Sequence, residues 1–342
     1  MGYLHYHPPQ VPHTMASKYP SSLNSSDREK DCKEIHDSWG RLNQLGHGLA
    51  HRSRSQLQQV RETYKAMYGE DLVDCIQRAK GVDSKNEICM VLSLWLCEPH
   101  ERDAIVAKDA MAQGDTKYRA LVEIYVGRKS SQLLLMQQAY RARFKKHLDQ
   151  EISILEPPTS TQKMLVALAT SHRAHHVDVN QHVAKCDAKR LYESGEGRAG
   201  SASIYESTVL EILSKRSIQQ LKLTFSTYKR IYGHDYTKSL KKGTSGEFED
   251  SLRAIVKCMY TPAKYYAKML HSGIKGTTMD KSALGRIIVS RAEVDMKEIQ
   301  DVYQKKYGMK LYDAICESIP EGDYRDFLLA LITRLPSSSS TS

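Results

Sequence analysis

The sequence predicts an all-α protein made of four copies of one helical unit. An arginine marks the same place in each copy, and a tyrosine follows it after twelve residues. The four pairs are Arg52 and Tyr64, Arg128 and Tyr140, Arg216 and Tyr228, and Arg291 and Tyr303. A fixed long-range register of this kind is the signature of a repeat array, and it is stronger evidence for the fold than any local pattern.

Apolar side chains recur at fixed offsets on both sides of each arginine. In the second copy they are Leu121, Tyr125, Leu133, Leu148 and Ile152. The offsets follow steps of three and four residues, which trace one face of a helix, and no segment shows the sustained alternation of a strand. We therefore expect one helix to end near each arginine, a second to run to the tyrosine, and further helices to complete each copy.

The end of the helix that carries the tyrosine is marked in three copies by a glycine. Gly69, Gly233 and Gly308 each lie five residues after the repeated tyrosine. Glycine at this place is typical of a helix C-terminus. In the second copy the same place holds Lys145, so a helix stop there needs another device.

The register also predicts the domain organisation. Four repeats of roughly 70 residues are flanked by disordered tails, and a longer gap separates the two halves of the array. The predicted segments are a tail at 1–26, repeat 1 at 27–97, repeat 2 at 98–170, a linker with the start of repeat 3 at 171–203, repeat 3 at 204–260, repeat 4 at 261–335 and a tail at 336–342.

Composition indicates in which compartment the protein is found and which partners it binds. The 342 residues carry a net charge of +10, which favours anionic partners. No zinc-finger spacing and no RNP-like strand accompanies this charge, so we expect an acidic phospholipid membrane rather than nucleic acid. No apolar run reaches the eighteen residues of a membrane span, and no signal peptide is present. The seven cysteines are scattered without a CxxC pair, as in a reduced cytosolic protein. We therefore predict a cytoplasmic, peripheral membrane protein.

Several blocks of the sequence resemble the annexin family, and the plant branch most closely. They are LAHRSRSQLQQVRETYKAMYGEDL (49–72), EPHERDAIVAKDAM (98–111), ALGRIIVSRAEVDMKEIQDVYQKKYG (283–308) and GDYRDFLLALI (322–332). The resemblance covers about residues 27 to 335. It implies four five-helix repeats packed as a curved disc, which calcium on the convex face bridges to acidic phospholipids.

The resemblance also implies where calcium would bind. In the family, a K-G-x-G-T loop and an acidic residue 27 positions after the repeated arginine supply the oxygen ligands that Ca²⁺ requires. The acid position is Ala79, Leu155 and Gly243 in the first three copies, and the first loop carries the cation Arg41. We expect these three sites to be lost. Trp39 would still lie in a lipid-facing loop, where tryptophan is favoured.

The fourth copy is the best candidate for a calcium site. Its loop at 275–280 keeps one glycine, and its acid position is Ser318, with an acid directly before it. Lys275 would face the lipid. The ligands that the resemblance implies are the carbonyl groups of Ile274, Gly276 and Thr278 and the carboxylate of Glu317. With so few matching residues, calcium binding is expected to be weak or absent.

Two further features follow from the resemblance. Asp103 with Arg128, and Glu123 with Arg286, match buried polar pairs of the family, and we interpret them as a structural brace because a buried arginine must be paired. His51 matches a histidine linked to peroxidase activity in plant annexins. The sequence shows no apolar haem pocket around it, so we predict a protein that is not an enzyme. A peroxidase-like enzyme and a helical scaffold for protein partners remain alternatives.

Overall fold

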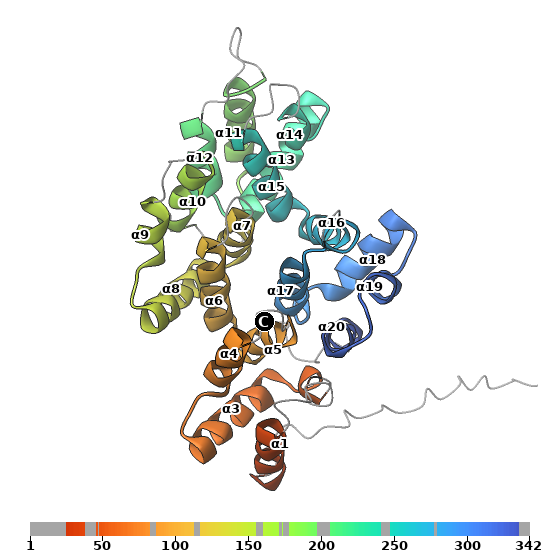
Figure 1. The fold of residues 1–342 in the computed structure, drawn as a ribbon. Coiled ribbons are helices and arrows are strands. Elements are labelled where there is room, and N and C mark those ends of the chain that lie inside the picture. The colour runs from red at the N-terminus through yellow and green to blue at the C-terminus, as the bar shows by residue number, and fades with distance from the viewer. Residues whose placement is uncertain are drawn as a thin grey trace, which may run out of the picture.

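The fold is a set of helices arranged in four groups (Figure 1). The computed structural model describes residues 25–37, 46, 48–82, 87–112, 117–154, 160–170, 173, 178–196, 206–240, 247–276 and 279–334. Within these ranges every regular element is a helix and none is a strand. The prediction of an all-α fold is confirmed. The predicted tail at 336–342 and nearly all of that at 1–26 lie outside the described residues, although α1 begins at Ser25.

The helices follow the repeated arginines as expected. The first group contains α1 (Ser25–Asp37), α3 (Arg54–Tyr68), α4 (Leu72–Val82) and α5 (Glu87–Leu96), with residues 48–50 also helical. The second contains α6 (Pro99–Ala112), α7 (Lys117–Gly127), α8 (Ser130–Phe144), α9 (Leu148–Ser153) and α10 (Ser160–Thr170). The third contains α11 (Gln181–Glu193), α12 (Glu206–Lys215), α13 (Ile218–Tyr232), α14 (Tyr236–Ser239) and α15 (Glu247–Tyr260). The fourth contains α16 (Pro262–Lys275), α17 (Lys281–Arg291), α18 (Met296–Tyr307), α19 (Leu311–Ser318) and α20 (Asp323–Thr333).

The repeated tyrosines anchor the third helix of each group. Tyr64, Tyr140, Tyr228 and Tyr303 are all essentially buried. Buried aromatic side chains of this size contribute strongly to a core. The helix α11 lies within the segment predicted as linker and start of repeat 3, and it packs against α12 and α13. The predicted segment boundaries themselves stay predictions.

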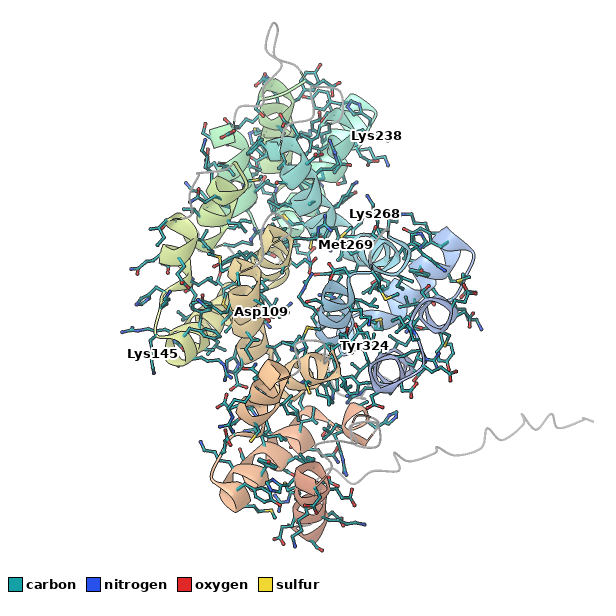
Figure 2. The ribbon with its side chains drawn as sticks, viewed as in Figure 1. Asp109, Lys145, Lys238, Lys268, Met269 and Tyr324 are labelled. Carbon is teal, nitrogen blue, oxygen red and sulfur yellow. The ribbon has the colours of Figure 1, made fainter. Side chains whose placement is uncertain are left out.

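The third helix ends in the same way in all four groups. Gly69, Gly233 and Gly308 adopt the left-handed conformation with φ of 75°, 78° and 71°. Lys145, which lies at the outer end of α8 in Figure 2, adopts it too, with φ of 57°. Its backbone N–H donates to the carbonyl of Arg141, as the glycines do to their own helices. The second copy therefore also ends its third helix with a left-handed residue, but this residue is a lysine, for which the conformation is strained.

Contacts between groups join the buried side chains into one apolar core. The helix α17 packs against α5, and α15 packs against α7 (Figure 1). At the first of these contacts Gly285 lets the backbones approach closely, because a Cβ atom there would lie 2.4 Å from Cγ1 of Val91. Tyr324 of α20 reaches the same place, and its hydroxyl donates to the carbonyl of Lys281 over 2.6 Å. A larger residue at 285 would push the first and fourth groups apart.

A second contact between the first and fourth groups is a layered cation–aromatic cluster. The guanidinium groups of Arg54 and Arg334 lie 4.4 Å and 5.1 Å from the ring centre of Trp95. Glu293 accepts from Nε of Arg54 over 2.6 Å and lies 3.5 Å from Arg334. The indole N–H of Trp95 donates to the carbonyl of Leu49. Since the tryptophan is fully buried, this cluster ties Arg334, which follows α20, to the first group.

The strain at Lys145 gives a testable prediction. The substitution Lys145→Gly is expected to raise the free energy of unfolding by about 0.5–1 kcal/mol, because glycine adopts a positive φ without a steric penalty. Urea denaturation followed by circular dichroism measures this change. The matched control is Gly233→Lys, which introduces the same strain where no atom lies within 4 Å of the new Cβ, and it should lower stability by about 1 kcal/mol. Equal stability of all three proteins would contradict the interpretation.

Candidate functional site

The loop of the fourth copy is described on both of its sides. Lys275 ends α16, Gly276 follows it, and Asp280 precedes α17. The backbone N–H of Asp280 donates to the carbonyl of Gly273 over 3.2 Å, and its side chain caps α17 by accepting from the N–H of Ala283. Gly276 has φ of −67° and ψ of 166°, a conformation open to any residue. Thr278, one of the predicted calcium ligands, lies outside the described residues.

The predicted acid of the fourth site lies beside this loop. Glu317, from the last turn of α19, has Oε2 3.4 Å from Nζ of Lys275, and both side chains are substantially exposed. The acid therefore comes from the expected helix and reaches the loop, although it faces an ammonium group. Ile274, another predicted ligand, is buried, and its carbonyl belongs to the last turn of α16, where carbonyls have no partner within the helix.

The donor set of this loop fits calcium only in part. Ca²⁺ takes six to eight oxygens, most often with several carboxylates. Within the described residues no group of three or more His, Cys, Asp or Glu side chains is placed to share a metal ion. Of the two carboxylates beside the loop, Asp280 caps α17, and Glu317 of α19 is contacted by Lys275. A metal here would depend chiefly on backbone carbonyls.

The other predicted loops are described only at their edges. Trp39 and Arg41 lie outside the described residues, as do the acid positions of the second and third copies. In the third loop Glu196 is described, and its Oε2 lies 2.9 Å from Nε2 of His234. That carboxylate is therefore already engaged. The loss of these three calcium sites stays a prediction.

Both predicted polar pairs are formed. Arg128 donates to Asp103 through Nε over 2.6 Å and through Nη2 over 3.0 Å. Arg286 of α17 donates to Glu123 of α7, which also accepts from the hydroxyl of Tyr265 over 3.2 Å. Burial would lower the pKa of each arginine, but the paired carboxylate raises the pKa above its usual value. The second pair links the second and fourth groups.

The polar contacts also include a buried arginine that sequence reasoning did not single out. Arg102 of α6 donates to the carbonyl of Val289 on α17 over 2.9 Å. Burial, together with the positive charge of Arg54, lowers the pKa of Arg102 to about 10. It lies next to Asp103, whose carboxylate is taken by Arg128. This contact is a second polar link between the second and fourth groups, beside the pair of Arg286 with Glu123.

The pair between Arg128 and Asp103 is one instance of a repeated tie. In each of the first three groups the repeated arginine donates to an aspartate on the first helix of the same group. The partners are Arg52 with Asp31 at 2.7 Å, Arg128 with Asp103 at 2.6 Å, and Arg216 with Asp187 at 2.7 Å. In the fourth group the place of the aspartate is taken by Tyr266. Arg291 stacks on that ring at 4.6 Å and pairs with Asp295 instead.

A second repeated contact accompanies the tie. The residue five positions after each of the three aspartates, and after Tyr266 in the fourth group, covers an aromatic ring on the third helix. The pairs are His36 on Tyr68, Lys108 over Phe144, Tyr192 on Tyr232, and His271 on Tyr307. The tie and this stacking together fix the first helix of each group against the second and third. The aromatic ring lies at a fixed distance from the repeated arginine in every copy, so this half of the pattern could have been found from the spacing.

His51, the residue of the alternative peroxidase reading, lies half-buried in a turn that leads to α3. It does not line the cavity of about 880 Å³ that the structure contains elsewhere, between α15 and α16. A haem ligand needs an enclosing apolar pocket. The geometry around His51 therefore gives this reading no support.

Comparisons with known proteins agree with this architecture. The annexin family model matches residues 43–89, 186–255 and 265–331. Human annexin A3 is 37% identical over 313 residues, which cover 92% of this chain and 94% of that protein. The chain belongs to the annexin family. Annexin Gh1 of Gossypium hirsutum is 35% identical over 88% of this chain and 94% of its own length. Because animal and plant relatives match about equally well, the plant branch stays a prediction.

Solved annexin structures show the same fold. The structure of annexin III has a TM-score of 0.80 and 34% identity, with 92% of this chain and 95% of that one covered. Chicken annexin V has a TM-score of 0.76 and 26% identity, with coverage of 92% and 98%. The predicted architecture of four annexin repeats is confirmed. None of the described helices is long and apolar enough to cross a membrane.

The tie of the third repeat allows a direct test. Asp187 is 1% exposed, so Asp187→Asn removes a buried acceptor charge from Arg216, and because the Arg216 side chain is 35% exposed, the protein is expected to lose about 1–2 kcal/mol of stability. The control is Asp301→Asn, which removes an exposed acid paired with Lys297 and should change stability by less than about 0.5 kcal/mol. Urea denaturation compares the two. Equal, small effects would show that the tie is dispensable.

Proposed function

We propose that this protein is a cytoplasmic annexin that binds acidic phospholipid membranes peripherally and depends on calcium only weakly. Family membership supports calcium- and phospholipid-binding in general. The net charge of +10 supports attraction to an anionic leaflet. The altered loops support the reduced dependence on calcium.

The single observation that carries the weakened calcium dependence is the contact between Lys275 and Glu317. A carboxylate that must hold Ca²⁺ is already 3.4 Å from an ammonium group of the same loop. The site would consist of the carbonyls of Ile274, Gly276 and Thr278 with Glu317, and Lys275 would have to move from the carboxylate. Calcium bound there would supply a bridge to lipid phosphate. One carboxylate and a competing lysine predict low affinity.

A calcium-independent component follows from the charge. Interactions between a basic surface and an anionic leaflet act over about one Debye length, which is about 8 Å at physiological salt, so they weaken as salt rises. Calcium coordination is far less sensitive to monovalent salt. Raising the salt concentration and adding a calcium chelator therefore separate the electrostatic part of membrane binding from the calcium-dependent part.

Vesicle sedimentation tests the proposal. Phosphatidylserine vesicles at about 0.05 M salt should retain the protein with a calcium chelator present, and about 0.5 M salt should release it. Calcium at about 1 mM should add a modest further fraction. Failure to bind in every condition would refute the membrane function. Binding that requires micromolar calcium would refute the weakened dependence.

The variant Glu317→Gln sharpens this test. It should abolish the increment due to calcium, because it removes the carboxylate of the fourth site, and it should change chelator-resistant binding no more than its control does, because both variants raise the net charge by one. The control is Glu321→Gln, which has the same charge change at a side chain that is 90% exposed and should keep the increment. Equal behaviour of the two variants would show that Glu317 is not a calcium ligand.

A further inference from the structure

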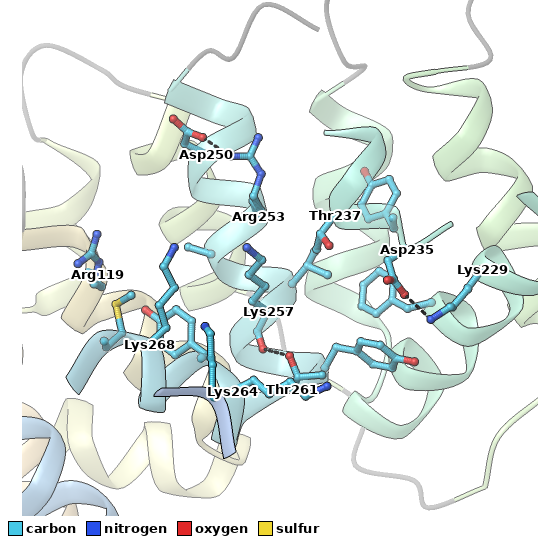
Figure 3. A pocket seen from close by; sticks show the side chains of 18 residues that line it. Arg119, Lys229, Asp235, Thr237, Asp250, Arg253, Lys257, Thr261, Lys264 and Lys268 are labelled. Atoms are coloured by element: carbon cyan, nitrogen blue, oxygen red, sulfur yellow. Dashed lines mark hydrogen bonds and ion pairs between the residues drawn. The ribbon is translucent and has the colours of Figure 1, made fainter. Parts of the chain in front are cut away.

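A basic cleft lies where the third and fourth repeats meet. Its volume is about 880 Å³, which is within the usual range of small-molecule sites. One residue, Thr261, joins α15 to α16, and the cleft lies between these two helices (Figure 3). The start of α14 forms another wall, and Arg119 of α7 and Lys306 of α18 also line the cleft. Buried rings of Phe225, Tyr236 and Tyr265 line it as well.

The charge of the cleft is strongly unbalanced. Seven Lys and Arg side chains line it, against two Asp. Both acids are already paired, Asp235 with Lys229 at 3.3 Å and Asp250 with Arg253 at 2.6 Å. The cleft therefore has an excess of five positive charges.

Several of these cations point into the same space. In Figure 3 the side chains of Lys257, Lys264 and Lys268 extend in the same direction between α15 and α16, with Arg253 beyond them and Arg119 to one side. Lys264, Lys268 and Arg119 form no ion pair with any side chain in the part of the chain that the structure describes. Nε of Arg253 also has no partner there, although it is buried.

This arrangement is unfavourable without a ligand. Lys264 and Lys268 are four residues apart on α16, so their like charges repel along one helix face. Lys257 of α15 adds a third charge to the same opening. A compact anion between these groups would offset the repulsion and give the guanidinium of Arg119 two oxygen acceptors.

We propose that this cleft binds a small molecule carrying two or three clustered phosphate groups, either free in solution or as the head group of a lipid. Each phosphate brings a charge of about −1.5 to −2 at neutral pH, so three such groups match the excess. Lysines act as point charges on phosphate, and arginines bind it through two parallel donors. The proposal does not depend on the calcium loop, since neither Lys275 nor Glu317 lines the cleft.

The direct test is calorimetric titration with inositol trisphosphate at about 0.15 M salt. The full chain should bind one molecule, and Lys264→Glu with Lys268→Glu should weaken binding by about tenfold or more. Both lysines are exposed, and circular dichroism checks the fold. The milder pair Lys264→Gln with Lys268→Gln should weaken binding by a smaller factor. The control Lys33→Glu with Lys185→Glu makes the same charge change at exposed lysines outside the cleft and should alter affinity by less than about twofold.

A second arm identifies the source of the phosphate. Vesicles containing phosphatidylinositol bisphosphate are compared with phosphatidylserine vesicles of equal charge. Preference for the former, lost in the Lys264→Glu and Lys268→Glu variant, assigns a lipid head group. Binding of the soluble probe without that preference assigns a free ligand. Absence of binding to either probe, or an equal loss in the control, overturns the proposal, whatever the outcome with phosphatidylserine alone.

Discussion

The structure depends on the repeated arginine at the end of the second helix of each repeat, which in three of the four repeats pairs with an acid on the first helix. Three repeats use the same aspartate position, with donor–acceptor distances of 2.6–2.7 Å. The fourth replaces the acid by Tyr266 and keeps Arg291 in place through the ring and Asp295. These arginine side chains are 8–35% exposed, and a partly buried charge is stabilised by a paired acid or a stacked ring, so the arginine holds helices together in every copy.

This tie explains how a repeat can keep its fold while its loop changes. The loop between the first and second helices comes before the second helix, whereas the arginine ends it. The contact that holds the two helices together therefore lies away from the loop. In the fourth repeat the loop departs from the family's K-G-x-G-T pattern at Thr278 and Met279, yet α16 packs against α17. Stability and calcium affinity can consequently change independently in this protein.

The fold was predictable from the sequence because the arginine and the tyrosine belong to one continuous stretch. Twelve residues separate them in every copy, and all four tyrosines are buried. The aspartate partners escaped the same reasoning because they lie 21, 25 and 29 residues before their arginines. Loops of different length between the helices destroy the fixed offset. The positive φ of Lys145 could not be predicted from the sequence either, because lysine is not a residue that favours this conformation.

The candidate sites were predictable to different degrees. The polar pairs Asp103 with Arg128 and Glu123 with Arg286 came from the family resemblance, and the side chains meet. Glu317 was expected beside the fourth loop because it directly precedes the acid position Ser318, but nothing in the sequence showed that its carboxylate would lie 3.4 Å from Nζ of Lys275. The basic cleft has no sequence signature. Its lining residues extend from Arg119 to Lys306, and only the packing of α7, α14, α15 and α16 brings their charges together.

The central claim is that this chain keeps the annexin scaffold while losing most of its metal chemistry. The number of calcium ions bound per chain on phosphatidylserine vesicles tests this most directly, by flow dialysis with labelled calcium up to about 1 mM. The account predicts no more than about one ion per chain, bound with low affinity. Two or more ions per chain, or one bound at micromolar concentration, would contradict it.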